Sequence, residues 1–291
     1  MKRAAFAAYA SLFALAVAVV GVVPLSAQWV SYRDSAVPRT RDGKPDLRAR
    51  TPLTRDGKPD LSGVWMHELT PAAEIRRLFG PSIDDRIKVD APGMEIGTQH
   101  KYSFNILLDF DEASMLRPRA RELMRLNTQN REPAAVCLHR PPSHFIRYDL
   151  LSEPIKIVQA PRITMVLYEA NDTHRQIYTD GRALPKEFDL PSFLGYSVGH
   201  WEGNTFVVET VGFNDKTRLD GQEHPHSEHL RVIERYTRRD FGRLDVETTF
   251  EDPELYMKPF TIKVPHDLLP DTDIFESFCE NEKDSAHLGQ R

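Results

Sequence analysis

Residues 230–251 read LRVIERYTRRDFGRLDVETTFE, and this stretch decides the fold. Two runs in which apolar and polar residues alternate flank Asp240-Phe241-Gly242. The pattern predicts two antiparallel β-strands joined by a three-residue turn, with Gly242 in the left-handed conformation.

Pairing Arg239 with Arg243 sets the register of this hairpin. Glu234 then shares one face with apolar residues from both strands, namely Leu230, Val232, Tyr236, Leu244, Val246 and Phe250. The other face places opposite charges directly across from each other, in the pairs Arg235–Glu247 and Arg231–Glu251. A slip of one residue would put charges on the apolar face, so two patterns select the same register.

This register turns the carboxylate of Glu234 toward the apolar side. A buried carboxylate is costly unless it is paired or hydrogen-bonded. Glu234 therefore either lines a polar pocket inside a barrel or bonds structural partners such as a buried Arg or a Tyr. The residues leave both readings open.

Other short β-rich runs surround the hairpin, separated by Gly, Pro, Asp and Asn. Regular short strands of this kind are typical of a sandwich or barrel. We expect a mainly β fold, an antiparallel meander barrel or strongly curved sheet, with a few short helices from the first half. The expected strands cover 155–159, 163–169, 174–179, 195–201, 205–211, 228–238, 243–250, 259–264 and 273–279.

The first part of the chain contains a direct repeat. The sequence TRDGKPDL occupies residues 40–47 and recurs at 54–61, and the Gly and Pro of each copy predict a turn. We expect residues 28–60 to form an extended arm that leads into a single β-rich domain at 61–291.

Two helices are predicted between the arm and the strands. The first lies between Thr70 and Gly80, where Thr70 can cap the start, Pro71 suits the first turn and Gly80 can end it. The second covers about 118–127 and has apolar residues along one face.

The N-terminus has the three parts of a secretory signal peptide. Lys2 and Arg3 precede an apolar run over 4–23, and Ala27 offers a small residue at a cleavage point before Gln28. An uncleaved membrane anchor is the alternative, because the run approaches the ~20 residues that span a bilayer. No second long apolar stretch follows. We therefore expect a signal peptide at 1–27 and a mature chain free of the membrane, periplasmic or extracellular.

The chain has two cysteines, Cys137 and Cys279. Export would place them where disulfides persist, so we predict that they are bonded to each other. Two buried free thiols are the alternative.

Composition narrows the classes of partner. Charged residues make up 28% of the chain and the formal net charge is -5, without a basic stripe interleaved with aromatics. Such a chain does not resemble a nucleic-acid-binding protein. A small-molecule ligand is the expected partner.

The densest group of polar residues is QEHPHSEH at 222–229. Imidazole and carboxylate groups bind zinc, copper or iron, so His224, His226 and His229 are candidate ligands for a divalent metal such as zinc or copper. The alternative is a hydrogen-bonded loop whose histidines fix its shape.

A second group of polar residues surrounds the strands at 195–211. His226 beside Asp215 at one rim of a barrel could act as a general base, or the two could make an ordinary loop contact. An internal site further requires His200 and Glu234 to converge on the same cavity. Candidate ligand-binding residues are Tyr196, Trp201, Asn214 and Tyr236.

Several short motifs resemble a widespread group of exported bacterial proteins of unassigned function. They are DGKPDLSGVW at 56–65, PIKIVQ at 154–159, WEGNT at 201–205, GFND at 212–215, HPHSE at 224–228 and DFG at 240–242. The resemblance implies no activity. The meander also looks like lipocalin-type (calycin) barrels, a likeness of fold that does not fix function.

Three functions follow from these patterns as hypotheses. The first is an exported barrel that binds a small molecule at its mouth, with acid/base chemistry of the isomerase, lyase or hydrolase type as an extension. The second is a metal-dependent enzyme that uses the histidine loop. The third is a non-catalytic envelope or extracellular interaction module.

Overall fold

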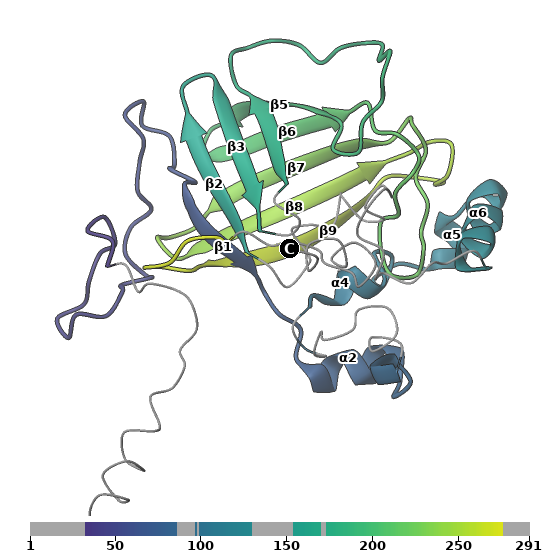
Figure 1. Ribbon diagram of the computed structural model, residues 1–291, viewed down its shortest axis with the longest axis horizontal. Coiled ribbons are helices and arrows are strands. Elements are labelled where there is room, and N and C mark those ends of the chain that lie inside the picture. The colour runs from purple at the N-terminus through teal and green to yellow at the C-terminus, as the bar shows by residue number, and fades with distance from the viewer. Residues whose placement is uncertain (1–32, 86–96, 98, 130–153, 170–172, 276–291) are drawn as a thin grey trace, which may run out of the picture. The chain divides into compact units, whose positions relative to one another are not determined.

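The computed structural model describes residues 33–85, 97, 99–129, 154–169 and 173–275. These residues form a closed barrel of nine strands in sequential order, in which β1 pairs with both β2 and β9 (Figure 1). The strands are β1 (Gly63–His67), β2 (Ile155–Ala160), β3 (Ile163–Tyr168), β4 (His174–Tyr178), β5 (Tyr196–Glu202), β6 (Thr205–Val211), β7 (Arg231–Arg238), β8 (Arg243–Glu251) and β9 (Phe260–Leu268). The mainly β fold is confirmed, and the closed barrel is consistent with the lipocalin-type likeness.

The register predicted for the β7–β8 hairpin is confirmed. Glu234 faces Thr248, and both charged pairs, Arg235 with Glu247 and Arg231 with Glu251, occupy facing positions. The even-numbered side chains of both strands are buried and the odd-numbered ones are partly exposed. Alternation in the sequence therefore identified the inner face of the barrel correctly.

The conformation predicted for Gly242 is wrong. Its φ is not positive, unlike that of Gly203 or Gly212. A Cβ atom at Gly242 would instead lie 2.6 Å from the Cβ of Leu47 in the arm, and the amide of Gly242 donates to the Leu47 carbonyl at 2.8 Å. Glycine is required here because another segment packs against the turn.

One pair of neighbouring strands departs from the antiparallel meander. β4 and β5 run parallel and are joined at only two positions, Ile177 with Ser197 and Tyr178 with Val198. A parallel pair needs a crossover connection, here the long loop 179–195 that arches over the barrel in Figure 1. The β4–β5 seam therefore has the fewest backbone pairs in the described barrel.

The ends of the barrel also differ from the prediction. The predicted strand at 273–279 is wrong for residues 273–275, which belong to no strand, and 276–279 lie outside the described residues. The barrel closes instead through β1, which begins directly after the second copy of the repeat.

Both copies of the repeat form the same turn, as predicted. The amide of Thr40 donates to Lys44 at 2.9 Å, and the amide of Thr54 donates to Lys58 at 2.8 Å. The copies differ in packing: Leu61 is 1% exposed within the barrel core, whereas Leu47 is 36% exposed. The second copy therefore contributes Leu61 to the barrel core, whereas the first copy forms a turn outside the barrel.

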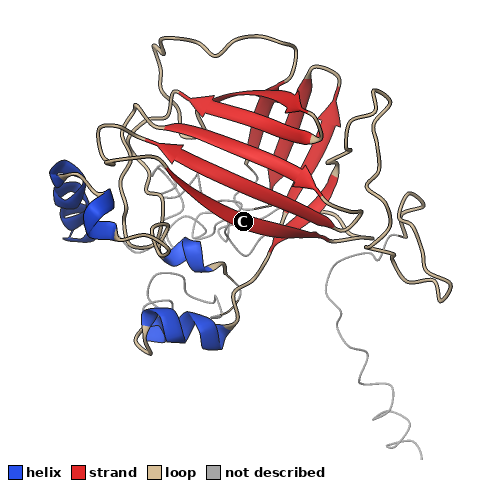
Figure 2. Ribbon diagram, turned by 180° about the vertical axis from the view of Figure 1, so that it is seen from behind, coloured by secondary structure: helices blue, strands red, loops and turns tan. Residues whose placement is uncertain are grey.

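The helices with both ends in the described residues lie on one side of the barrel (Figure 2). They are α2 (Ala72–Phe79), α4 (Lys101–Phe104), α5 (Glu112–Met115) and α6 (Pro118–Gln129). Gly80 ends α2 with a φ of 79°, as expected. Thr70 does not cap α2, because its hydroxyl accepts the amide of Lys101 at 2.9 Å. The residue thus ties α4 to the end of β1.

Two apolar clusters of buried residues form the core. One is centred on Trp65, Phe206 and Leu244 inside the barrel. The other joins α4, α5 and α6 to β7–β9 and includes Leu107, Phe250 and Phe260. The signal segment 1–27 and both predicted disulfide partners, Cys137 and Cys279, lie outside the described residues.

Candidate functional site

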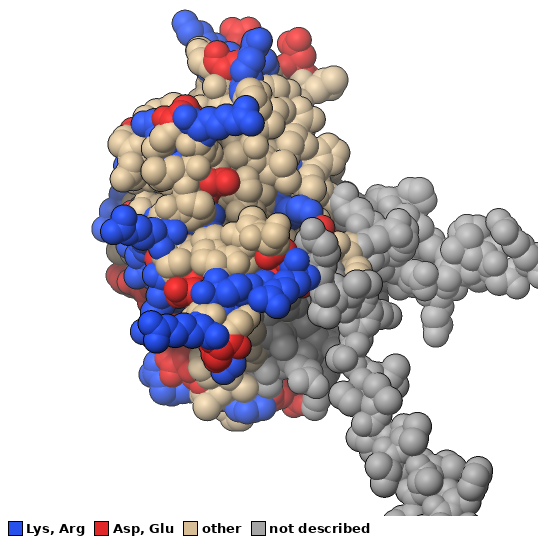
Figure 3. Space-filling model, turned by 90° about the vertical axis from the view of Figure 1, so that its left-hand side faces the viewer, with Lys and Arg blue, Asp and Glu red and all other residues tan. Residues whose placement is uncertain are grey.

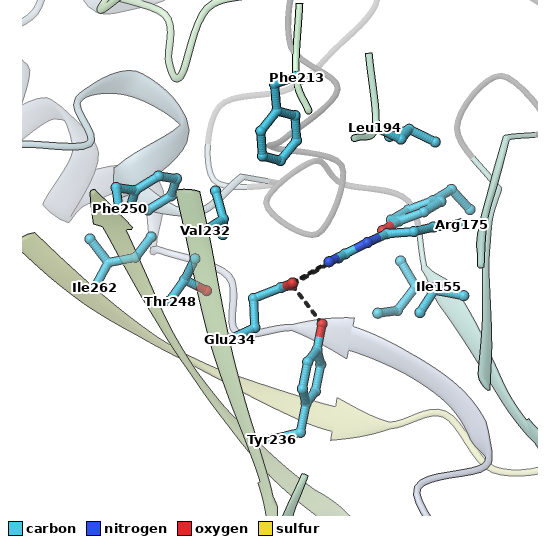
Figure 4. Close-up of a pocket in the computed structure, with 12 residues that line it drawn as sticks. Ile155, Arg175, Leu194, Phe213, Val232, Glu234, Tyr236, Thr248, Phe250 and Ile262 are labelled. Atoms are coloured by element: carbon cyan, nitrogen blue, oxygen red, sulfur yellow. Dashed lines mark hydrogen bonds and ion pairs between the residues drawn. The ribbon is translucent and has the colours of Figure 1, made fainter. Parts of the chain in front are cut away.

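The barrel encloses a small cavity of about 40 Å³ (Figure 4). Apolar side chains from several strands make up most of its wall, and Leu194 and Phe213 reach it from the loops. Its lining residues are Ile155, Val166, Tyr168, Arg175, Leu194, Phe213, Val232, Glu234, Tyr236, Thr248, Phe250 and Ile262. The cavity is therefore an apolar space with a compact polar group on one wall.

A paired Arg and Glu form the centre of that polar group. Nη1 of Arg175 on β4 donates to Oε1 of Glu234 on β7 at 3.0 Å, and Nη2 donates to the other carboxylate oxygen. Their side chains are 10% and 7% exposed. Tyr236 donates its hydroxyl to Glu234 at 2.7 Å, as Figure 4 shows.

Two hydroxyls complete the shell around Arg175. Its Nε donates to Ser197 on β5 at 2.9 Å, and its Nη2 donates to Thr210 on β6 at 2.6 Å. One guanidinium thus connects four consecutive strands from inside the barrel. It does so next to the β4–β5 seam, where backbone pairing is shortest.

The electrostatics of this cluster hold Arg175 and Tyr236 each in one protonation state. Burial acts to lower the pKa of Arg175, but the Glu234 carboxylate together with Tyr168 and Tyr236 outweighs burial, and the pKa is raised well above its ordinary value. Burial and the same carboxylate raise the pKa of Tyr236 well above its ordinary value. Neither group exchanges a proton near neutral pH, so the cluster is built to hold a polar group in place.

The structure places two of the sequence-predicted residues, Glu234 and Tyr236, in this cavity. The reading of Glu234 as bonded to a buried Arg and a Tyr is confirmed, and the same carboxylate also lines the cavity. Trp201 lies elsewhere in the core and packs on Phe206, with ring centres 5.2 Å apart.

Three other predicted residues lie away from the cavity. Tyr196 stacks on Tyr178, with ring centres 5.2 Å apart. His200 is half-exposed and lies 3.3 Å from Glu202. Asn214 is buried in a loop, where its side-chain oxygen accepts the amide of Lys216.

The predicted convergence of His200, Asp215, His226 and Glu234 on one cavity is not found. Asp215 is exposed in its loop. His226 is buried, with Nε2 2.5 Å from the Thr217 hydroxyl and Nδ1 3.2 Å from the Ser227 carbonyl. Burial lowers the pKa of His226 to about 4, so this imidazole is a neutral, hydrogen-bonded part of the loop.

The other two histidines of the loop have separate partners. His224 is buried, with Nδ1 2.5 Å from Asp220 and Nε2 3.4 Å from Glu112. Burial acts to lower its pKa, but the two carboxylates outweigh burial and raise it to about 9. His229 is exposed beside Glu254, at 2.9 Å. The three imidazoles therefore do not form one ligand set.

Two absences among the described residues concern metal ions and membranes. In this part of the chain, no three His, Cys, Asp or Glu side chains lie where they could share a metal ion. No helix within the described ranges is both long and apolar enough to cross a membrane.

Sequence reasoning missed Arg175, the residue that organises the site. Its signal is the spacing in β4: Ile177 faces the core, so the side chain two residues earlier faces it as well. An Arg at an inward position and a Glu at another form the pair that burial demands.

No protein-family model, curated protein or solved structure matches the chain. Function is therefore inferred from the site itself.

Proposed function

We propose that this chain is an exported protein that binds a small, neutral, largely apolar molecule inside its barrel. The observation that carries the proposal is the internal cavity, whose polar wall consists of Arg175, Glu234 and Tyr236. Acid/base chemistry has less support than binding, because burial and pairing hold Arg175 and Tyr236 in fixed protonation states.

The volume of the cavity limits the size of the ligand. At about 40 Å³ it is far below the ~300–1,000 Å³ of pockets for drug-sized ligands. One water needs roughly 10–15 Å³ on this measure, so the space suits a ligand of about three or four non-hydrogen atoms. Ligands this small bind weakly, with at most about 1.5 kcal/mol per atom, so we expect millimolar dissociation constants.

The charges around the cavity select a neutral ligand. Arg175 and Glu234 are the charged members of the described lining, and they neutralise each other. An ionic ligand would bring one uncompensated charge into an apolar interior, which costs several kcal/mol. A neutral molecule avoids that cost.

The polar wall also determines which hydrogen-bonding groups a ligand needs. The hydrogen bonds to Ser197, Thr210 and Glu234 use four of the five N–H groups of Arg175. The Glu234 carboxylate has lone pairs beyond those that Arg175 and Tyr236 occupy. A hydroxyl can accept from the guanidinium and donate to the carboxylate, so a small alcohol matches this wall.

The test compares propan-2-ol with two charged molecules of the same size, acetate and isopropylammonium. Methyl signals of Ile155, Val166, Val232 and Ile262 report on the cavity in NMR titrations of the mature protein. We expect saturable shifts with propan-2-ol and none with either ion. Absence of saturable shifts with propan-2-ol, or equal shifts with acetate, would contradict the proposal.

Export is tested separately. The full chain is expressed in a bacterium and the mature N-terminus is determined by mass spectrometry. Cleavage at the Ala27–Gln28 bond and recovery outside the cytoplasm are expected, since the first 27 residues follow the secretory pattern. An intact N-terminus in the membrane fraction would favour the anchor.

A further inference from the structure

The wall of the cavity carries one more polar group, the hydroxyl of Thr248 on β8. Thr248 is buried, with 7% of its surface exposed. We infer that this hydroxyl is a second binding group, and that the cavity takes a small molecule with polar atoms on two neighbouring carbons. A 1,2-diol is the simplest such molecule. This inference rests on the proposed function and narrows its ligand class.

The Thr248 hydroxyl has no hydrogen-bond partner among the described residues. By contrast, the hydroxyl of the next residue, Thr249, lies 2.8 Å from that of Thr261 on the outer face. Buried polar groups are nearly always paired, and an exception calls for a specific cause. A ligand that supplies the missing hydrogen bond is such a cause.

The hydroxyl oxygen of Thr248 also borders the cavity. Within the described chain, the polar side-chain atoms that lack a hydrogen bond and are fully enclosed by protein belong to Arg39, His224, Asp245 and His266. Thr248 is not among them, so its oxygen is open to the cavity that the side chain lines. Figure 4 shows Thr248 beside Glu234 on the same wall. A ligand in the cavity can therefore contact this oxygen.

The register of β7 and β8 places Thr248 next to the polar cluster. Glu234 and Thr248 occupy facing positions, and both side chains are buried on the inner face. Facing residues of an antiparallel pair have Cβ atoms about 4.5–5.5 Å apart. Two oxygens on neighbouring carbons of one ligand can therefore reach one of these residues each.

Glu234 can bind the first of these oxygens. Arg175 and Tyr236 donate three hydrogen bonds to its carboxylate, and a carboxylate has about four lone-pair positions. The remaining position can accept a ligand hydroxyl. The Thr248 hydroxyl can donate to the second oxygen or accept from it. A ligand with a single polar atom would satisfy only one of the two residues.

Two probes of equal size isolate the contribution of Thr248. Ethane-1,2-diol and propan-1-ol each have about four non-hydrogen atoms, which the cavity of about 40 Å³ admits. The probes differ only in a hydroxyl that replaces a methyl group. A site that hydrogen-bonds a substrate hydroxyl rejects the analogue that lacks it, because its own polar group stays unpaired. We expect the diol to bind about fivefold more tightly, the factor that one neutral hydrogen bond supplies.

The experiment measures the dissociation constants of both probes by NMR titration of the mature protein. The methyl signals of Ile262, which faces Thr248 on β9, report on binding. Thr248→Val replaces the hydroxyl by a methyl group and should reverse the preference, so that propan-1-ol binds more tightly. Thr248→Ser keeps the hydroxyl and should keep the preference. Thr249→Val, on the outer face, is the matched control and should bind as the unchanged protein does.

The outcomes distinguish this inference from the proposed function. A preference for the diol that Thr248→Val reverses supports both. Saturable binding of both probes, with the same ratio of dissociation constants in Thr248→Val as in the unchanged protein, overturns the inference and leaves the proposed function standing. If neither probe binds saturably, both are overturned.

Unfolding of the ligand-free protein tests whether the hydroxyl has a structural role instead. A buried hydroxyl without a partner is costly, so Thr248→Val should raise the unfolding temperature by about 2–4 °C. A fall of similar size would show that the hydroxyl makes a stabilising bond within the folded chain, and would overturn its assignment to the ligand.

Discussion

Two clusters of buried polar side chains differ in how their charges are accommodated away from water. Arg175 and Glu234 are both charged, neutralise each other and have hydroxyl partners from neighbouring strands. His67, His100 and His266 are buried, and the ring of His67 meets each of the other two edge to face. In the first cluster pairing compensates for burial, whereas in the second burial lowers the pKa of His100 and His266 and keeps them uncharged at neutral pH.

The difference shows how each cluster responds to change. Removing one member of an ion pair leaves the other charge buried and alone. Removing one neutral imidazole leaves no such charge, but adding a proton to one does. The first cluster should therefore be sensitive to substitution and the second to pH. Charged groups on the surface differ from both clusters because they are exposed to water. In Figure 3, Lys and Arg side chains lie next to Asp and Glu side chains.

The largest effect is expected from Glu234→Leu. This substitution leaves Arg175 buried without its carboxylate, which should cost about 3–5 kcal/mol of unfolding free energy. The double variant Arg175→Met/Glu234→Leu removes both charges and should recover most of that loss. Urea unfolding measures both variants. A double variant no more stable than Glu234→Leu would show that the pair is not energetically coupled.

Acid should destabilise the protein through its neutral histidines. The folded pKa values of His100 and His266 are about 3, below the ordinary value of 6.5, so the unfolded chain binds protons first as pH falls. Their stabilisation is complete above pH 6.5 and declines from there toward pH 3, by about 1.4 kcal/mol per pH unit for each residue.

His266→Phe tests this acid limb. Because the variant removes one titrating group, the loss of stability between pH 6.5 and 5.5 should be smaller by about 1 kcal/mol. His200→Asn, at an exposed position, should leave the slope unchanged. Equal slopes for His266→Phe and the unchanged protein would exclude the cluster as the cause.

His224 should produce the opposite limb. Its folded pKa is raised to about 9, so it keeps its proton while the unfolded chain loses one above pH 6.5. Stability should therefore fall as pH rises from 6.5 toward 9, by about 1.4 kcal/mol per pH unit. Asp220→Asn removes the main carboxylate partner and should flatten this limb, which unfolding curves at several pH values will show.

The smallest effect is expected on the outer face of β7. Arg235 is next to Glu234 in sequence but points outward, where it pairs with Glu202 and is 40% exposed. Arg235→Gln should cost only about 0.2–1 kcal/mol, because exposed ion pairs contribute little. A cost near that of Glu234→Leu would contradict the division between the inner and outer faces.

The hairpin illustrates how much of the fold the sequence predicts. Alternation and charge complementarity in residues 230–251 act locally and agree with each other, so the register and the inward position of Glu234 were predictable. The same alternation in β4 and β9 places Arg175 and His266 inside. The inward direction of these two side chains follows from the alternation. The sequence analysis did not predict it, because each is a polar residue among apolar neighbours on the same face.

Other features depend on contacts between distant segments. Gly242 is close to Leu47 in the folded chain, and Thr70 bonds Lys101 instead of capping α2. No local pattern records either contact. The loop at 222–229 contains three histidines, but each imidazole contacts a different partner. Histidines that are close in the sequence therefore did not come together at one site.

The most direct test of ligand binding in the barrel compares the dissociation constant for propan-2-ol between the unchanged protein and Arg175→Met/Glu234→Leu. NMR titration of the cavity methyl groups measures both. Loss of the hydrogen bonds from the polar wall should weaken binding about tenfold, as expected for roughly 1.4 kcal/mol. Equal or tighter binding by the folded double variant would contradict the assignment of this wall as the polar end of the ligand site.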